Sequence, residues 1–354
     1  MTDFWRGRSV LVTGHTGFKG GWLCLWLSRL GASVTGLALP PETDPNLYEA
    51  ARVGETLTSI TADVRDLSAV SAAFARTKPS VVFHLAAQSL VRASYQDPVG
   101  TYATNVMGTA HVLEAARHTP GVAAVVVVTS DKCYENREWC WGYREYEPLG
   151  GRDPYSSSKG CAELVTAAYR RSFFEKHGPA VASARAGNVI GGGDWAADRL
   201  VPDIMRALAA GKPAPIRNPS SIRPWQHVLE PLAGYLRLAE ALCAGNPQAA
   251  AAFNFGPAEE EAVPVAELAD RLCALWGDGA GWQNLAEQDA PHEAHYLKLD
   301  SSRARTDLGW VRRLDLSAAL SWTADWYRAH ARGENMQAAT LGQIDQYAAL
   351  SGRA

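Results

Sequence analysis

Tyr155 and Lys159 lie four positions apart in the segment YSSSK and could together move a proton. If Tyr155 opens a helix, Lys159 lies one turn later on the same face. An ammonium beside a phenol stabilises the phenolate, so we expect the pKa of Tyr155 to fall from about 10 toward neutrality. Such a phenolate can take the proton of an alcohol while a hydride leaves the same carbon. The same spacing also occurs on ordinary helix surfaces, so the pair needs supporting motifs.

A second polar cluster lies upstream of this pair. Ser130, Asp131 and Lys132 follow the apolar run Val125–Val128 almost directly. A hydroxyl, an acid and an amine then stand together at the end of a predicted strand, where they can donate and accept protons.

A glycine-rich turn near the N-terminus points to a dinucleotide. The β-branched run 9–13 reads as a buried strand, and Gly14, Gly17 and Gly20 follow it in GHTGFKG. An apolar helix pattern comes next and ends at Gly31, a plausible C-cap. Strand, glycine turn and helix offer free amide groups and a positive dipole end to a pyrophosphate. The alternative is a purely structural connection between strand and helix.

Composition favours a globular enzyme. The chain has 354 residues, of which 47% are hydrophobic and 20% charged, and its formal net charge of −3 argues against nucleic acid or an anionic membrane as main partner. The six cysteines are scattered without zinc spacing, so we expect no metal site. We see no signal peptide and no apolar run that could span a bilayer, and therefore expect reduced thiols and a cytoplasmic location.

Alternating strand and helix patterns in the first half predict a doubly wound, parallel α/β sheet of the Rossmann type. Ligands of such sheets bind beyond the carboxyl ends of the strands, where GHTGFKG, Asp63-Val64, AAQSL and TSDK all fall. The expected strands are Ser9–Thr13, Ser33–Leu39, Thr58–Thr61, Val81–Ala87, Ala123–Thr129 and Ala180–Ala186. The expected helices between them are Leu67–Arg76, Pro98–Arg117 and Tyr155–Lys176.

Beyond about Gly187 the pattern changes to loops with a few helices. Helical patterns return at Val263–Trp276, Leu316–His330 and Glu334–Ser351. We predict a larger domain from residues 1–187 with about 226–255, and a smaller C-terminal domain from 188–225 and 256–354. Four tryptophans in loop-like segments could line a pocket: Trp139, Trp141, Trp195 and Trp225.

Taken together, these residues resemble the extended short-chain dehydrogenase/reductases, and specifically the nucleotide-sugar 4,6-dehydratases. The resemblance covers nearly the whole chain. It rests on VLVTGHTGFKGGWL, FHLAAQSLVRASYQDP, VVTSDKCYENREW, WGYREYEPLGGRDPYSSSKG and RPWQHV. The block TSDKCYENREW is specific for the subfamily that acts on CDP-glucose, whereas the glycine and Tyr-x-x-x-Lys motifs indicate only the superfamily. The expected place of the reaction is deoxysugar biosynthesis, as for lipopolysaccharide O-antigen.

The resemblance implies a reaction in which the chain is a lyase on net chemistry. Tyr155 removes the proton of the sugar 4-hydroxyl while carbon 4 gives a hydride to NAD, and Ser130 hydrogen-bonds the 4-oxygen. Loss of the carbon-5 proton and the 6-hydroxyl then expels water, with Asp131 as the acid. The hydride returns to carbon 6, and CDP-glucose becomes CDP-4-keto-6-deoxyglucose.

Lys132 is a departure from the relatives that act on dTDP-glucose, which carry a Glu there as the carbon-5 base. A Lys can serve as a base only when neutral. Burial, Lys159 and the oxidised nicotinamide would lower its pKa, and Asp131 would oppose them. The alternative is that Lys132 orients neighbouring groups or binds an anion.

The resemblance also implies NAD as cofactor and a set of contacts for it. An acid about twenty residues after the glycines usually holds the ribose of NAD, and Glu42 and Asp44 lie slightly beyond that position. No Arg stands between Gly31 and Ala51 to hold the 2′-phosphate of NADP. Asp63 would contact the adenine, or it caps a turn. The expected cofactor residues are Gly14, Gly17, Phe18, Gly20, Asp63, Val64, Leu85, Ala86 and Ala87, with Tyr155 and Lys159.

For the nucleotide sugar, the resemblance places Asn188, Arg199 and Arg223 at the substrate, with Arg223 the best candidate for the pyrophosphate. Gln88 and Ser89, with Arg92 nearby, would line the sugar pocket. Tyr296, with His292 and His295, is expected to come from the C-terminal lobe, or to be exposed to solvent. A homodimer is expected through the helices Pro98–Arg117 and Tyr155–Lys176.

Two other classes of function stay open. A 4-epimerase or reductase on the same scaffold would not need Asp131 and Lys132 after Ser130. A catalytically inactive dinucleotide-binding protein would not need Ser130, Tyr155 and Lys159 intact.

Overall fold

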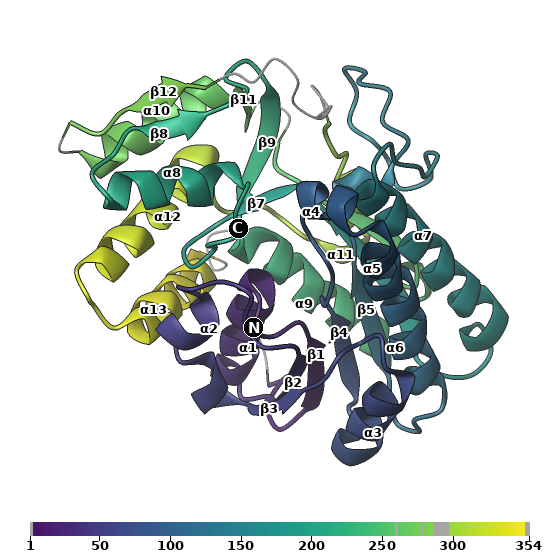
Figure 1. The fold of residues 1–354 in the computed structure, drawn as a ribbon. Helices are drawn as coiled ribbons and strands as arrows, with labels where there is room; N and C mark the ends of the chain where they lie inside the picture. The colour runs from purple at the N-terminus through teal and green to yellow at the C-terminus, as the bar shows by residue number, and fades with distance from the viewer. Residues whose placement is uncertain (1–2, 259–260, 278, 286–296, 351–354) are drawn as a thin grey trace.

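A seven-stranded parallel sheet forms the centre of the molecule (Figure 1). The computed structural model describes residues 3–258, 261–277, 279–285 and 297–350. The strand order is β10-β6-β5-β4-β1-β2-β3, which confirms the doubly wound α/β class. Its strands are β1 (Ser9–Thr13), β2 (Ser33–Ala38), β3 (Thr58–Thr61), β4 (Val81–His84), β5 (Ala124–Val128), β6 (Ala180–Ala186) and β10 (Ala252–Phe255).

Both faces of this sheet are covered, which explains the continuous apolar runs of its strands. In β1, Val10 and Val12 pack into one hydrophobic cluster and Leu11 into the other. One face carries α3 (Leu67–Thr77), α6 (Gly108–Arg117) and α7 (Pro154–Tyr169), which contact one another in sequence (Figure 1). The other face carries α1 (Phe18–Arg29) and α9 (Leu229–Cys243).

Three of the expected helices differ from the observed ones for a clear local reason. The stretch 98–117 is α5 (Pro98–Tyr102), a π-helical turn η2 (Ala103–Met107) and α6. Helix α7 begins at Pro154, where Asp153 caps it by accepting from the Ser156 amide at 2.9 Å, and it continues into η4 (Arg170–Phe174). Pro264 ends a short strand, β11 (Ala262–Pro264), so α10 (Val265–Trp276) begins later than predicted.

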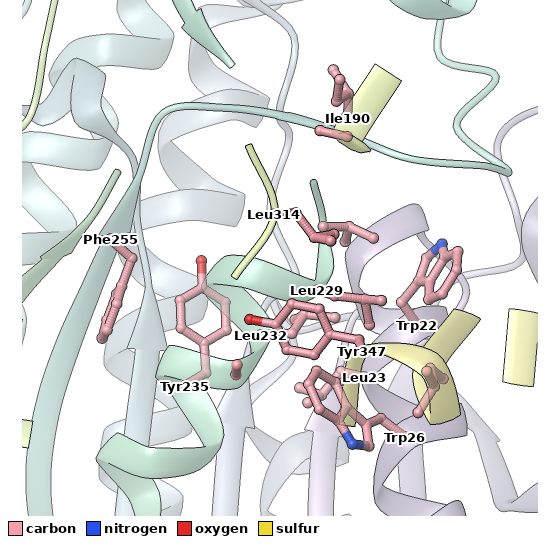
Figure 2. Packing of buried hydrophobic residues seen from close by; sticks show 14 of the residues in the cluster. Trp22, Leu23, Trp26, Ile190, Leu229, Leu232, Tyr235, Phe255, Leu314 and Tyr347 are labelled. Atoms are coloured by element: carbon pink, nitrogen blue, oxygen red, sulfur yellow. The ribbon is translucent and has the colours of Figure 1, made fainter. Parts of the chain in front are cut away.

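Helices α12 (Leu316–Ala331) and α13 (Met336–Ala349) join the C-terminal part to the sheet through an aromatic core (Figure 2). Trp22 and Trp26 of α1 belong to one cluster with Tyr347 of α13 and Tyr235 of α9, and Trp26 packs edge-on against Tyr347 with ring centroids 5.6 Å apart. The Trp22 indole donates to the Gly192 carbonyl at 2.9 Å, so even this buried polar group is satisfied.

Two small sheets cover the carboxyl edge of the large one. They are β11-β9-β7, with β7 (Asn188–Ile190) and β9 (Ile222–His227), and β12-β8, with β12 (Trp282–Asn284) and β8 (Ala214–Ile216). The remaining elements are α2 (Leu47–Ala50), η1 (Val53–Thr56), α4 (Val91–Gln96), η3 (Asp131–Cys133), α8 (Leu200–Ala209), η5 (Pro247–Ala249) and α11 (Ser302–Leu308).

The division into two domains stays a prediction. The register places β10 beside β6, so the chain returns to the large sheet at residues 252–255. Across the described residues, the helices are too short or too polar to cross a membrane.

Candidate active site

A cavity of about 1170 Å³ runs along the carboxyl edge of the large sheet. It exceeds the usual volume of a pocket for one small ligand, roughly 300–1,000 Å³. Its walls include the segments that follow β1, β2, β3, β4, β5 and β6, and on the other side residues 193–203 and 215–225. The four motif segments that the sequence placed beyond strand ends therefore meet in one space, as predicted.

The glycine turn after β1 has the geometry that a pyrophosphate requires. Gly14 has φ +80°, and a Cβ there would lie 2.7 Å from the Ala86 amide nitrogen. A Cβ on Gly20 would lie 2.0 Å from the Gly14 carbonyl oxygen, so the turn and α1 can only pack with glycine there. No side chain among the described residues caps α1 at Gly17, and Gly17 and Phe18 line the cavity. The first amide groups of the helix are thus available to an anion.

Two residues of the glycine motif carry chemistry that we did not single out from the sequence. Burial lowers the pKa of His15 to about 4, so its imidazole is neutral, and its Nε2 lies 2.8 Å from the Ser59 hydroxyl. Lys19 lines the cavity, where burial and then the charges of Arg199 and Lys159 lower its pKa to about 7. Their position within a glycine motif was the available signal.

The segments after β2, β3 and β4 form the far end of the cavity. Glu42 lines it, whereas Asp44 is not among its lining residues. Asp63 also lines it, but its carboxylate accepts from Arg65 Nη2 at 2.6 Å, and this hydrogen bond is the main cause that lowers the pKa of Asp63. Val64, Leu85, Ala86 and Ala87 line the same wall.

The catalytic turn, as we call residues 129–134, follows β5 and includes η3. The Ser130 hydroxyl donates to Asp131 Oδ1 at 2.9 Å, and Lys132 Nζ lies 3.8 Å from the same oxygen. Ser130 and Asp131 are buried, but 34% of the Lys132 side chain is exposed. Lys132 is therefore only half-buried, less than expected, because it lines the cavity.

Tyr155 and Lys159 stand in the first turns of α7, on the wall beside the catalytic turn. Burial raises the pKa of Tyr155, while the charge of Lys132 and the Ser130 hydroxyl oppose that rise. The expectation of a pKa near neutrality is thus wrong for this structure, because desolvation of the phenolate outweighs the cations. Burial also lowers the pKa of Lys159 to about 8, and its ammonium donates to the Val128 carbonyl at 3.4 Å.

The expected substrate residues are spread around the other end of the cavity. Arg199 donates to Asp194 at 2.9 Å and to Ser89 at 2.8 Å, so it ties the loop after β7 to the loop after β4. Asn188 donates to the Pro224 carbonyl at 3.3 Å, and Arg223 lines the cavity next to it in β9. Tyr296, His292 and His295 lie outside the described residues.

The Gln88 side chain is less free to contact a substrate than expected, because it is hydrogen-bonded to neighbouring residues of the protein. Its Nε2 donates to Thr101 at 2.9 Å and its Oε1 accepts from the Leu90 amide. Asn105, which we did not predict, accepts from the Gln88 amide at 2.8 Å and donates to Ser158 at 2.8 Å. It stands in the π-helical turn η2, a feature frequent at functional sites.

Trp195 and Trp225 line the cavity, whereas Trp139 and Trp141 do not contribute to it. Trp139 stacks on Tyr143 with ring centroids 5.2 Å apart, and 68% of Trp141 is exposed. Within the described ranges, no group of three or more His, Cys, Asp or Glu side chains could hold a metal ion.

Comparisons with known proteins agree with this geometry. The description "NAD dependent epimerase/dehydratase family" matches residues 10–256. A CDP-glucose 4,6-dehydratase of Salmonella typhimurium is 52% identical over 99% of both chains. A dTDP-glucose 4,6-dehydratase of Streptomyces griseus is 32% identical over 70% of this chain and 72% of that one.

Solved structures share the fold. A dTDP-glucose 4,6-dehydratase of Streptomyces venezuelae, solved with NAD bound, superposes with a TM-score of 0.77 at 23% identity and covers 93% of this chain and 99% of that one. A UDP-glucose 4-epimerase of Stenotrophomonas maltophila, also with NAD, gives a TM-score of 0.79 at 23% identity and covers 92% and 99%. At this identity the two superpositions support the architecture alone.

Proposed function

The chain belongs to the NAD dependent epimerase/dehydratase family, and we propose that within it the protein is a 4,6-dehydratase that acts on CDP-glucose. The observation that carries the proposal is the similarity to the Salmonella CDP-glucose 4,6-dehydratase along nearly the full length of both chains. The product is CDP-4-keto-6-deoxyglucose, and the second product is water. The cofactor is NAD, which the description of the family names.

The glycine turn supports the assignment of the cofactor end of the cavity. Its close contacts leave room only for glycine, and its helix begins at the cavity wall. NAD, when bound, supplies a reversible hydride acceptor, so oxidation at carbon 4 and reduction at carbon 6 cancel. The residues that would hold it are Gly14, Gly17, Phe18, Gly20, Asp63, Val64, Leu85, Ala86, Ala87, Tyr155 and Lys159.

Tyr155 takes the proton of the sugar 4-hydroxyl in this mechanism, and Ser130 hydrogen-bonds the same oxygen. The contact between the Ser130 hydroxyl and the phenol supports the pairing of these roles. The role proposed for Lys159, one helical turn from Tyr155, is to favour the phenolate by its opposite charge against the burial that raises the pKa of Tyr155.

Asp131 and Lys132 divide the elimination of water between them. In the reactive form of this pair the shared proton is on Asp131 and Lys132 is the neutral amine. Lys132 then takes the proton from carbon 5, Asp131 gives its proton to the departing 6-hydroxyl, which leaves as water, and the proton on Lys132 returns to Asp131. Their 3.8 Å separation in one turn supports a shared role at adjacent carbons of one sugar. Asp131 is the buried member and Lys132 the more exposed one, which suits an acid held in place and a base that exchanges protons with solvent.

At the other end, we propose that Arg199, Arg223 and Asn188 hold the pyrophosphate and Gln88 and Ser89 line the sugar pocket, since all five line the cavity. The preference for cytidine rests on the similarity to the Salmonella protein. We also propose that Tyr296, from the C-terminal lobe, is a substrate-binding residue.

A homodimer through α5, α6 and α7 is part of the proposal. The segments 98–117 and 154–174, which include η2 and η4, and the neighbouring α4 expose large apolar side chains that a second copy would cover: Tyr95, Val99, Tyr102, Met107, Leu164 and Phe173. All six cysteines are free thiols, which supports a cytoplasmic enzyme. A role in deoxysugar synthesis for O-antigen stays a prediction.

The test is an assay of the purified protein with NAD and, separately, CDP-, dTDP-, UDP- and GDP-glucose. Formation of a 4-keto-6-deoxy sugar, seen by its alkaline absorbance, is expected with CDP-glucose at the highest kcat/KM. Turnover of another nucleotide sugar at a higher kcat/KM would show that the preferred nucleobase is not cytosine. Interconversion at carbon 4 without loss of water would replace the dehydratase with an epimerase.

A further inference from the structure

A buried ion pair lies directly behind the catalytic turn. Glu163 of α7 and Arg185 of β6 face each other with Arg185 Nη2 2.7 Å from Glu163 Oε2, and only 3–4% of either side chain is exposed. Neither residue lines the cavity. Replacing a buried ion pair by apolar side chains often costs no stability. The presence of this pair behind an active site therefore indicates a role other than stabilising the fold.

The carboxylate of Glu163 holds the first residue of the catalytic turn. The Thr129 hydroxyl donates to Glu163 Oε1 at 2.5 Å, and the Ser183 hydroxyl donates to Oε2 at 2.7 Å. Thr129 directly precedes Ser130, so its side chain fixes the point at which the chain leaves β5.

The guanidinium of Arg185 holds the last residue of the same turn. Its Nη1 donates to the Tyr134 hydroxyl at 2.7 Å, and the guanidinium lies 4.9 Å from the centre of the Tyr134 ring. The Tyr134 hydroxyl in turn donates to Asn254 of β10 at 2.8 Å. Both ends of the turn are therefore tied to one ion pair, and Ser130, Asp131 and Lys132 lie between the two ties.

We propose that Glu163 and Arg185 are positioning residues that clamp the catalytic turn at Thr129 and Tyr134 and so hold Ser130, Asp131 and Lys132 toward the sugar. This inference rests on the proposed function, because it assigns the clamp to the elimination of water. The pair touches none of the reacting atoms, and it acts through the turn.

Glu163 has a second effect through α7, where it follows Lys159 by one helical turn. Burial lowers the pKa of Lys159, and the carboxylate of Glu163 raises it. Among the described residues, Cys133 of η3, Lys19 of α1 and His84 of β4 are titratable groups that also interact with Lys159. Of these groups Glu163 is the one that accepts from both Thr129 and Arg185.

The decisive variant is Thr129→Val/Tyr134→Phe, which removes both ties and leaves the ion pair in place. We expect kcat for CDP-glucose to fall about tenfold, because the catalytic groups are no longer held in one orientation, with KM changed less than about threefold. Amide hydrogen exchange of the segment 129–134 should become faster, while that of α7 stays as in the wild type. Wild-type kcat together with wild-type exchange in this variant would overturn the proposal.

Glu163→Gln tests the pair itself. It should lower kcat at least about tenfold and move the alkaline limb of the kcat/KM profile to lower pH, because Lys159 loses its neighbouring carboxylate. Wild-type kcat and an unmoved alkaline limb in a folded Glu163→Gln protein would also overturn the proposal. If this variant does not fold, Thr129→Val/Tyr134→Phe decides alone.

Glu230→Gln is the matched control, since Glu230 is also a buried helical glutamate, but its carboxylate accepts from two backbone amides and Tyr347. It should keep kcat and the alkaline limb. A wild-type protein that is inactive on CDP-glucose would overturn the proposed function instead, and the exchange measurement would then test the clamp without any turnover.

Discussion

Two buried glutamates, in different regions of the molecule, have pKa values shifted in opposite directions. Glu163, behind the catalytic turn, faces a guanidinium and accepts two hydroxyl donors; although burial opposes it, the pKa of Glu163 is lowered and the group stays charged. Glu230, between α9 and the C-terminal segments, accepts from the Arg313 and Leu314 amides and from Tyr347. Burial raises its pKa, and these donors only partly oppose the rise.

The difference indicates what each region is for. At the carboxyl edge of the sheet, buried charges are kept because protons and a hydride must move there. Between α9 and α13 the carboxylate serves as a hydrogen-bond acceptor, and a neutral group of the same shape would serve as well. Variants at the edge should therefore change turnover, whereas variants in the second region should leave turnover unchanged and alter only stability and its dependence on pH.

The largest effect is expected from Tyr155→Phe. It removes the base at the 4-hydroxyl, so kcat should fall by a factor of about a hundred to ten thousand, the range of a general-base contribution. The melting temperature and NAD affinity should stay near the wild-type values, measured by thermal unfolding and by titration. Activity within a few-fold of the wild type would mean that another group is the base.

Asp131→Asn should block the loss of water by a factor of about a hundred or more, because an amide keeps the shape but cannot act as an acid. Oxidation at carbon 4 should survive, and single-turnover measurements should show reduced cofactor accumulating. An unchanged rate of 4-keto-6-deoxy sugar formation would exclude Asp131 as the acid.

Lys132→Met should retain the oxidation but lose exchange of the carbon-5 hydrogen with solvent deuterium by a factor of roughly a hundred. Lys132→Glu should restore part of this exchange, since a carboxylate can also accept the proton. Exchange at the wild-type rate in Lys132→Met would move the base elsewhere, with Glu135 or a water held by Tyr155 as the next candidates.

The smallest effect on turnover is expected from Glu230→Gln, which sharpens the comparison through stability. A carboxyl whose folded-state pKa is raised stabilises the fold most below its unfolded pKa of about 4.3, and this contribution is lost as the pH rises toward the folded value. The wild type should therefore lose more stability between pH 4 and pH 8 than Glu230→Gln. Denaturant unfolding at both pH values measures this, and parallel losses would contradict the assignment.

Glu163→Gln should behave oppositely in the same unfolding experiment. Because the pKa of Glu163 is lowered in the folded protein, its carboxylate stabilises the wild type above about pH 4.3, and this stabilisation is lost as the pH falls. At neutral pH the variant leaves Arg185 buried without its anion, so it should be less stable than the wild type by about 3–5 kcal/mol.

Much of the active site was predictable because it follows local patterns. Apolar runs fixed the strands, the spacing of Gly14, Gly17 and Gly20 identified the dinucleotide turn, and Ser130–Lys132 followed a strand directly. Parallel strands bring their carboxyl ends to one edge, so segments distant in sequence could be placed together without a structure.

The tertiary structure alone decided the electrostatics. Whether Tyr155 is stabilised as a phenolate depends on desolvation, which comes from distant packed segments and here outweighs the nearby cations. Lys132 turned out to be partly exposed for the same kind of reason, since its surroundings are set by where the cavity opens. The pairing of Glu163 with Arg185 joins a helix to a strand, and no sequence spacing encodes it. Sequence periodicity specifies the faces of elements over a few residues, whereas burial and charge separation depend on how those faces finally pack.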